Sequence, residues 1–168
     1  TAQPLYLGTD IGGETVGLIT YMRTDGVQMA NEAITAIREH IGSTIGPAFV
    51  PEKPRFYTSK AKNAQEAHEA IRPTDVSRSL DQVARYLTDE QRRLYELVWK
   101  RAVASQMQSA ELDQVIVELA DATGQTAMRA TGSIIAFEGF LKLYSEGRDD
   151  SKADDDESRV LPAMQEGD

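Results

Sequence analysis

The hydrophobic pattern of the chain changes near residue 107, and this change constrains the fold more than any other feature of the sequence. Before it, apolar residues recur every three or four positions, which is typical of a helix with one buried face. After it they alternate, which is typical of a strand. We therefore expect an α+β chain, with a mainly helical domain over 1–106 and an antiparallel β segment over 107–168. An acidic loop is expected at about 146–158.

Two segments of the first part have strong helix signals. Ala30–Ile41 places isoleucines on one stripe, and we expect this helix to end at Gly42, because glycine commonly follows the last turn. Thr88 with Gln91 has the spacing of a capping box. That box opens the longest predicted helix, at about Asp89–Ser105.

Two further helix starts are predicted in the same part of the chain. Ser79 and Gln82 also have capping-box spacing. A short helix over 63–72 should end before Pro73, because the residue preceding a proline disfavours the helical conformation. The glycines and prolines of 42–57 indicate a loop with an extended end.

The second part shows the period of a β-hairpin. Apolar side chains alternate over 115–119, a turn is expected at Thr123–Gly124, and Gln125–Thr131 can return as the partner strand. A further apolar run, Ile134–Tyr144, follows.

Composition excludes several classes of protein. With 168 residues and 40% hydrophobic content, the chain can bury a real core. No apolar run approaches the roughly 18 residues of a membrane span, so no membrane association is expected. The absence of cysteine excludes disulfides and thiolate metal sites. The expected location is therefore the cytoplasm.

The net charge of −9 is unevenly distributed. Residues 1–106 hold thirteen basic and thirteen acidic residues, whereas 107–168 hold five and fourteen. Residues 53–62 contain four cations and no acid, so this stretch can meet phosphates although the chain is acidic overall. A solvated loop is the alternative explanation of the same residues. The four cations are Lys53, Arg55, Lys60 and Lys62.

The first candidate site surrounds Tyr21. If Leu18–Thr24 is extended, Tyr21, Arg23 and Asp25 point to the same face. A tyrosine hydroxyl is a poor nucleophile at neutral pH and needs a nearby base or cation. Arg23 can supply that charge, and its planar fork can also grip a phosphate.

The second candidate site lies in Ala64–Pro73, with His68 at the edge of the apolar stripe of the predicted helix. Considered alone, His68 is more often a structural histidine than a catalytic one. Glu69 and Arg72 are most simply an ion pair on a helix surface. The zinc-protease pattern is excluded, because Arg72 stands where its second histidine should be.

Together these stretches resemble the type IA DNA topoisomerases. The residues that carry the resemblance are Gly17–Asp25 and Ala64–Thr74, with weaker support from Leu94–Trp99 and Val103–Met107. The resemblance implies that 1–106 is the family's tyrosine-bearing domain, which is related to helix-turn-helix folds. It implies that 107–168 is part of the family's β-rich arch, or gate.

The resemblance also implies an isomerase mechanism. Tyr21 matches the nucleophile that breaks a single DNA strand and becomes joined to the 5′ phosphate. Another strand then passes, the break is resealed, and negatively supercoiled DNA is relaxed without ATP. Arg23 matches the arginine that positions the scissile phosphate, and His68 matches a histidine that assists. Supporting DNA-binding roles are expected for Thr20, Asp25, Lys60, Lys62 and Arg72.

The sequence departs from the family in two respects. Gly26 stands where many members have serine. The acidic motif of the Mg²⁺-binding Toprim domain does not occur, so we expect an internal fragment with no metal site and no activity alone. Its expected partners are single-stranded or negatively supercoiled DNA of the nucleoid and the remaining domains of the parent enzyme. The competing hypothesis is a non-catalytic module that binds single-stranded DNA or protein, with Tyr21 a buried core aromatic.

Overall fold

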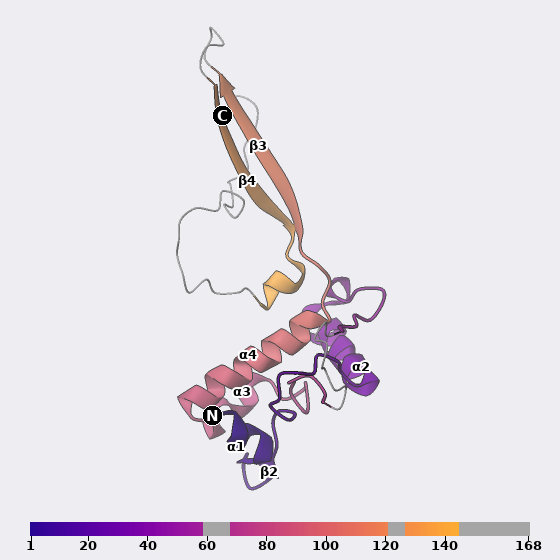
Figure 1. The fold of residues 1–168 in the computed structure, drawn as a ribbon, viewed down its shortest axis with the longest axis vertical. Helices are drawn as coiled ribbons and strands as arrows, with labels where there is room; N and C mark the ends of the chain where they lie inside the picture. The colour runs from indigo at the N-terminus through magenta and orange to yellow at the C-terminus, as the bar shows by residue number, and fades with distance from the viewer. Residues whose placement is uncertain (59–67, 121–126, 145–168) are drawn as a thin grey trace. The chain divides into compact units, whose positions relative to one another are not determined.

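The computed structural model describes residues 1–58, 68–120 and 127–144. The contacts of the chain divide it into two units, Thr1–Gln108 and Ser109–Asp168, which are described one at a time. In the described ranges the helices longer than four residues lie in the first unit and a long β-hairpin lies in the second, which confirms the α+β class (Figure 1). No helix in these ranges is long and apolar enough to cross a membrane.

Helix α4, Asp89–Ser105, organises the first unit. Its predicted capping box is confirmed: the Gln91 amide donates to Thr88 Oγ1 at 3.3 Å, and the Thr88 amide donates to Gln91 Oε1 at 2.9 Å. Helix α1, Ala2–Leu7, lies near the N-terminal part of α4, and α2, Asn31–His40, lies near its C-terminal part (Figure 1). The helix predicted from local pattern is thus the element against which the others pack.

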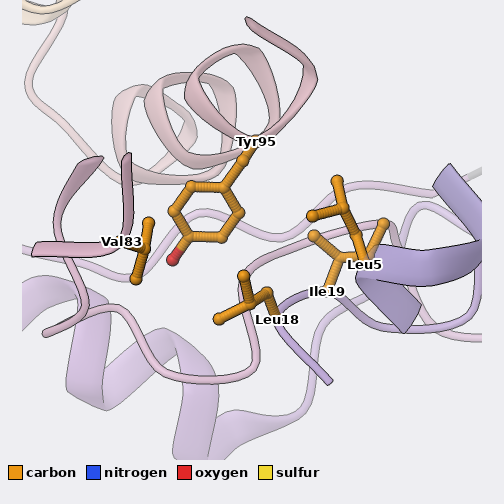
Figure 2. Close-up of a cluster of buried hydrophobic side chains, with 5 residues drawn as sticks. All are labelled: Leu5, Leu18, Ile19, Val83 and Tyr95. Carbon is orange, nitrogen blue, oxygen red and sulfur yellow. The ribbon is translucent and has the colours of Figure 1, made fainter. Parts of the chain in front are cut away.

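The core of this unit forms around one buried aromatic ring on α4. The Tyr95 ring points between Val83 on one side and Leu5, Leu18 and Ile19 on the other (Figure 2). All five side chains are at most 2% exposed. Each contributes about 1.5–3 kcal/mol by leaving water. The strand-like segment before Tyr21 is therefore anchored in the core by two consecutive buried residues.

The predicted end of α2 at Gly42 is wrong. A π-helical turn, Ile41–Ile45, continues α2 past Gly42, and the chain leaves the helix at Gly46. Gly46 has φ +134°, a conformation that favours glycine. Gly42 lies within the helical turn, where a Cβ atom would make only ordinary van der Waals contact. A 3₁₀ turn, Pro47–Phe49, follows directly, so the predicted loop begins later than expected.

The capping box predicted at Ser79 is also wrong. Helix α3, Leu80–Val83, is only four residues long, and Ser79 makes no side-chain cap. The Gln82 amide donates instead to the Ser79 carbonyl at 3.1 Å. The chain then tightens into a 3₁₀ turn, Ala84–Tyr86, so the amide that the box required is already satisfied by a backbone bond.

The second unit contains a long antiparallel hairpin of β3, Glu111–Ala120, and β4, Ala127–Phe137 (Figure 1). Strand β4 runs further than predicted, so the expected apolar run Ile134–Tyr144 begins inside it and continues in a 3₁₀ turn, Gly139–Lys142. Two predicted features lie outside the described residues: the turn at Thr123–Gly124 and the acidic loop at about 146–158.

A buried glutamine of the first unit holds the backbone at Arg55. Gln106 is 0% exposed, accepts from the Arg55 amide at 3.1 Å and donates to the Arg55 carbonyl at 2.9 Å. Gln106→Leu should lower the free energy of unfolding by about 2–3 kcal/mol, because both backbone groups lose their partner. Urea unfolding of the chain measures this. Gln82→Leu, at an exposed position, is the control, and equal effects of the two changes would contradict the role of Gln106.

Candidate active site

Tyr21 lies at the surface directly after the core segment. Its side chain is 47% exposed, whereas Leu18 and Ile19 are each 1% exposed. We predicted an extended segment over Leu18–Thr24, and this holds only at its start, where Ile19 forms an isolated bridge with Pro73. The chain then bends at residues 24 and 25. The exposure of Tyr21 contradicts the competing hypothesis that it is a buried core aromatic.

Tyr95 shows what a structural tyrosine looks like in this chain. It is 0% exposed, and its hydroxyl donates to the Arg78 carbonyl at 2.7 Å. Burial, with a smaller contribution from Asp75, raises the pKa of Tyr95 to about 12, against the lowering effect of Arg78. That hydroxyl stays protonated and is sealed from any substrate. Tyr21, by contrast, is open to solvent.

The helix predicted over 63–72 is wrong where the structure describes it. Residues 68–72 are not helical, and 63–67 lie outside the described residues. The Ala70 amide donates to the Gln28 carbonyl at 2.8 Å, and the Arg72 carbonyl accepts from the Thr20 amide at 2.9 Å. These backbone groups bond to Thr20 and Gln28, on either side of Tyr21, so they are not available for a helical hydrogen-bond ladder.

Thr20 joins the two segments through its side chain as well. Its hydroxyl donates to the Ala70 carbonyl at 2.7 Å and accepts from the Arg72 amide at 3.0 Å. These bonds hold the residue before Tyr21 against the segment that follows His68. Thr20 therefore has a structural role here, and its direct contact with DNA stays a prediction.

This pairing brings His68 next to Tyr21, with ring centroids 5.7 Å apart and planes at 36°. Asp25 lies between Arg23 and His68: its Oδ2 is 2.8 Å from Arg23 Nε, and its Oδ1 is 3.5 Å from His68 Nδ1. The bend at residues 24 and 25 accompanies the Arg23–Asp25 contact, in place of the predicted strand alternation. Four residues named from the sequence thus meet at one place: Tyr21, Arg23, Asp25 and His68.

The arrangement suits the binding of a phosphate next to the tyrosine. Arg23 uses Nε in its ion pair, and its side chain is 55% exposed, so the outer face of the guanidinium can reach a phosphate oxygen. His68 Nδ1 and Asp25 Oδ1 are buried and have no hydrogen-bond partner within the described residues. The two atoms face each other at 3.5 Å.

Arg72 is engaged differently from Arg23. Its guanidinium binds both carboxylate oxygens of Glu69, at 2.7 and 3.0 Å, and donates to the Pro73 carbonyl at 3.0 Å. The predicted ion pair therefore exists, although not on a helix, and the Arg72 side chain is only 15% exposed. Its contact with DNA stays a prediction, and Lys60 and Lys62 lie outside the described residues.

The structure adds one residue that the sequence did not single out. The ring of Tyr6 packs edge-on against that of Tyr21, with centroids 5.3 Å apart and planes at 63°. Nothing in the local pattern marks Tyr6, because it lies at the end of a short helix and belongs to no recognisable motif. Only the contact identifies it.

The described residues do not form a metal site. No group of three or more histidine, cysteine, aspartate or glutamate side chains in them could hold an ion. Asp25, the carboxylate between Arg23 and His68, already forms an ion pair with Arg23 through Oδ2. Mg²⁺ needs an octahedral set of oxygen ligands, and these residues do not supply one.

Glu69 makes a contribution to the stability of the fold that depends on pH. Burial raises the pKa of Glu69, but hydrogen bonds from Arg72 and the Ala30 amide outweigh it and hold the pKa below its ordinary value of 4.5. A lowered pKa in the folded state adds stability above pH 4.5, which is lost as the pH falls through the lower, folded-state value.

Glu69→Gln should therefore lower the free energy of unfolding by about 1–2 kcal/mol at pH 7, since it weakens charge-assisted hydrogen bonds. The difference from the wild type should shrink as the pH falls below 4.5. Urea unfolding at a series of pH values measures both effects. Glu39→Gln, at an exposed position of α2, is the control. A difference that is independent of pH would rule out the proposed ion pair as its source.

Comparison with known proteins gives one consistent answer. A family model described as DNA topoisomerase matches residues 1–168. DNA topoisomerase 1 of Rickettsia prowazekii is 50% identical over 98% of the chain and 21% of the relative. The Xylella fastidiosa protein of the same name is 54% identical over 99% of the chain and 20% of the relative. The solved topoisomerase I of Thermotoga maritima matches with a TM-score of 0.71 and 31% identity, over 96% of the chain and 25% of that structure.

The chain thus spans about a fifth of the length of these curated relatives. Because the family model matches it from the first residue to the last, the chain belongs to the type IA DNA topoisomerase family, that of bacterial DNA topoisomerase 1.

Proposed function

We propose that this chain forms the catalytic-tyrosine domain, over 1–106, and part of the arch, over 107–168, of a longer enzyme that relaxes negatively supercoiled DNA without ATP. The observation that supports this most directly is the exposed Tyr21 beside His68 and an Arg23–Asp25 pair, in a chain of the type IA family. The substrate is a single-stranded stretch of DNA in the cytoplasm, at the nucleoid.

The proposed reaction is a reversible transfer of a phosphodiester. The Tyr21 hydroxyl oxygen attacks the phosphorus and its proton passes to water, while the bond to the 3′ oxygen breaks and that oxygen takes up a proton. The 5′ phosphate is then joined to Tyr21 as an ester that retains the bond energy. After another strand has passed, the 3′ hydroxyl attacks the phosphotyrosine, and the strand is restored with Tyr21 free.

Arg23 and His68 act on the phosphate in this proposal. Arg23 places positive charge against the oxygens on which negative charge develops, which lowers the barrier because the charge is already in position. Asp25 contacts both residues and holds their side chains toward the same place. His68, next to the Tyr21 ring, contacts the phosphate region through Nε2.

The longer enzyme would also hold Mg²⁺, on the acidic residues of a Toprim domain in the part that this chain does not span. The described residues do not fit the ion, so no step above passes through it. The length of the relatives supports such a division, since the chain covers 21% and 20% of two of them. The isolated chain should therefore bind single-stranded DNA weakly and not turn over.

The polarity of the covalent adduct tests the proposal. The full-length enzyme is incubated with Mg²⁺ and a single-stranded oligonucleotide labelled at either its 3′ or its 5′ end, and is then denatured and run on a gel. We expect the 3′ label to move with the protein and the 5′ label to be released on a shortened strand. The opposite polarity, or no adduct with either label, would reject the function.

A further inference from the structure

Tyr6 packs against the proposed nucleophile but has no part in the mechanism above. Its ring meets the Tyr21 ring edge-on, with centroids 5.3 Å apart, inside the 4.5–7 Å range of favourable aromatic pairs. We propose that Tyr6 is a positioning residue, whose ring holds the Tyr21 phenol in the orientation from which its hydroxyl attacks DNA. This inference rests on the proposed function and adds a residue to that site.

The backbone on which Tyr6 stands is bound to the backbone that leads to Tyr21. Leu5, the preceding residue, is 0% exposed, and its carbonyl accepts from the Leu18 amide at 2.6 Å and from the Ile19 amide at 3.3 Å. These two bonds join the end of α1 to the residues that lead to Tyr21. The contact between the two rings follows from this fixed pairing.

Gly17 permits the close approach. A Cβ atom at this position would lie 2.6 Å from the Tyr6 carbonyl oxygen, a distance that side chains do not tolerate. Any other residue would push the end of α1 away from the tyrosine segment. Gly17 and the Leu5 carbonyl thus act together to set the distance between Tyr6 and Tyr21.

Tyr21 needs such support because it is 47% exposed. An exposed side chain samples several rotamers, and ordering it costs free energy at each catalytic event. Ring contacts with Tyr6 and His68 restrict the Tyr21 ring before DNA arrives. A nucleophile that is held near its attack geometry reacts faster than one that must be oriented first.

The test uses the full-length enzyme with Tyr6→Ala, Tyr6→Leu and Tyr6→Phe. Single-turnover cleavage of a labelled oligonucleotide at saturating concentration gives the rate constant, and anisotropy without Mg²⁺ gives the Kd for the same strand. We expect Tyr6→Ala and Tyr6→Leu to cleave about two- to tenfold more slowly, from the usual strength of an aromatic pair, with Kd unchanged. Tyr6→Phe keeps the ring and should restore the rate.

Leu7→Ala is the matched control, because Leu7 follows Tyr6 in the same helix and is 68% exposed. Tyr6→Leu retains apolar bulk, so it separates loss of the ring from loss of folding, which thermal unfolding checks. Wild-type rates in both Tyr6→Ala and Tyr6→Leu would overturn the proposal. A weaker Kd with an unchanged rate would also overturn it, and would show that Tyr6 binds DNA directly. If the wild type itself forms no adduct, the proposed function is rejected, and the inference about Tyr6 is rejected with it.

Discussion

Replacing Tyr21 with phenylalanine is expected to abolish the covalent protein–DNA adduct and DNA relaxation, and to leave binding of single-stranded DNA intact. The change removes only the hydroxyl oxygen that would attack the phosphorus in the proposed reaction. The side chain is 47% exposed, and its ring contacts with Tyr6 and His68 do not involve the hydroxyl, so the fold should be unaffected.

The measurement is a denaturing gel of the 3′-labelled oligonucleotide after reaction with the full-length enzyme, beside a supercoil-relaxation assay. Tyr57→Phe is the control: Tyr57 is 44% exposed, close to the exposure of Tyr21, and its hydroxyl donates to the Ser105 carbonyl at 2.8 Å. We expect that variant to keep forming the adduct. Residual adduct or nicking by Tyr21→Phe would show that another residue is the nucleophile.

Replacing Arg23 with alanine is expected to slow cleavage by about 10²–10³-fold, the usual effect of removing a preorganised group that stabilises transition-state charge. The guanidinium is the cation nearest in sequence to Tyr21, and its side chain is 55% exposed beyond the ion pair with Asp25. Single-turnover cleavage at saturating DNA measures the change. The Kd should rise much less, because one phosphate contact contributes little to total binding.

Two further variants separate charge from geometry. Arg23→Lys keeps the charge but loses the planar fork, so its cleavage rate should lie between those of the wild type and Arg23→Ala. Arg92→Ala removes a cation from α4, where Arg92 pairs with Asp89 at 3.5 Å, and should leave cleavage unchanged. If Arg23→Ala weakens binding and leaves the saturated rate unchanged, Arg23 only binds DNA.

The elements that were predicted correctly are those whose signals are local. Helix α4 begins at the predicted capping box of Thr88 and Gln91, because both hydrogen bonds join residues three positions apart. The hairpin of β3 and β4 was predicted from the alternation over 115–119 and a return strand that begins after residue 124. Such patterns need no knowledge of the rest of the chain.

The failed prediction at the second candidate site depends on distant partners. The pattern of 63–72 favours a helix, yet the described backbone at Ala70 and Arg72 bonds to Gln28 and Thr20. A short helix is marginal by itself, so these bonds and those of the Thr20 side chain are preferred at the described positions. The end of α2 failed for a local reason, since the turn lies at Gly46, beyond the first available glycine.

The sequence by itself determined the family, the α+β class and the four residues of the candidate site, because these depend on residue identity and on spacing along the chain. Only the folded chain shows that Tyr21 is exposed while Tyr95 is buried, and that the ring of Tyr6 packs against that of Tyr21. It also placed Asp25 beside His68. The physical reason is that these contacts are set by backbone hydrogen bonds between separate segments, which leave no periodic trace in either segment.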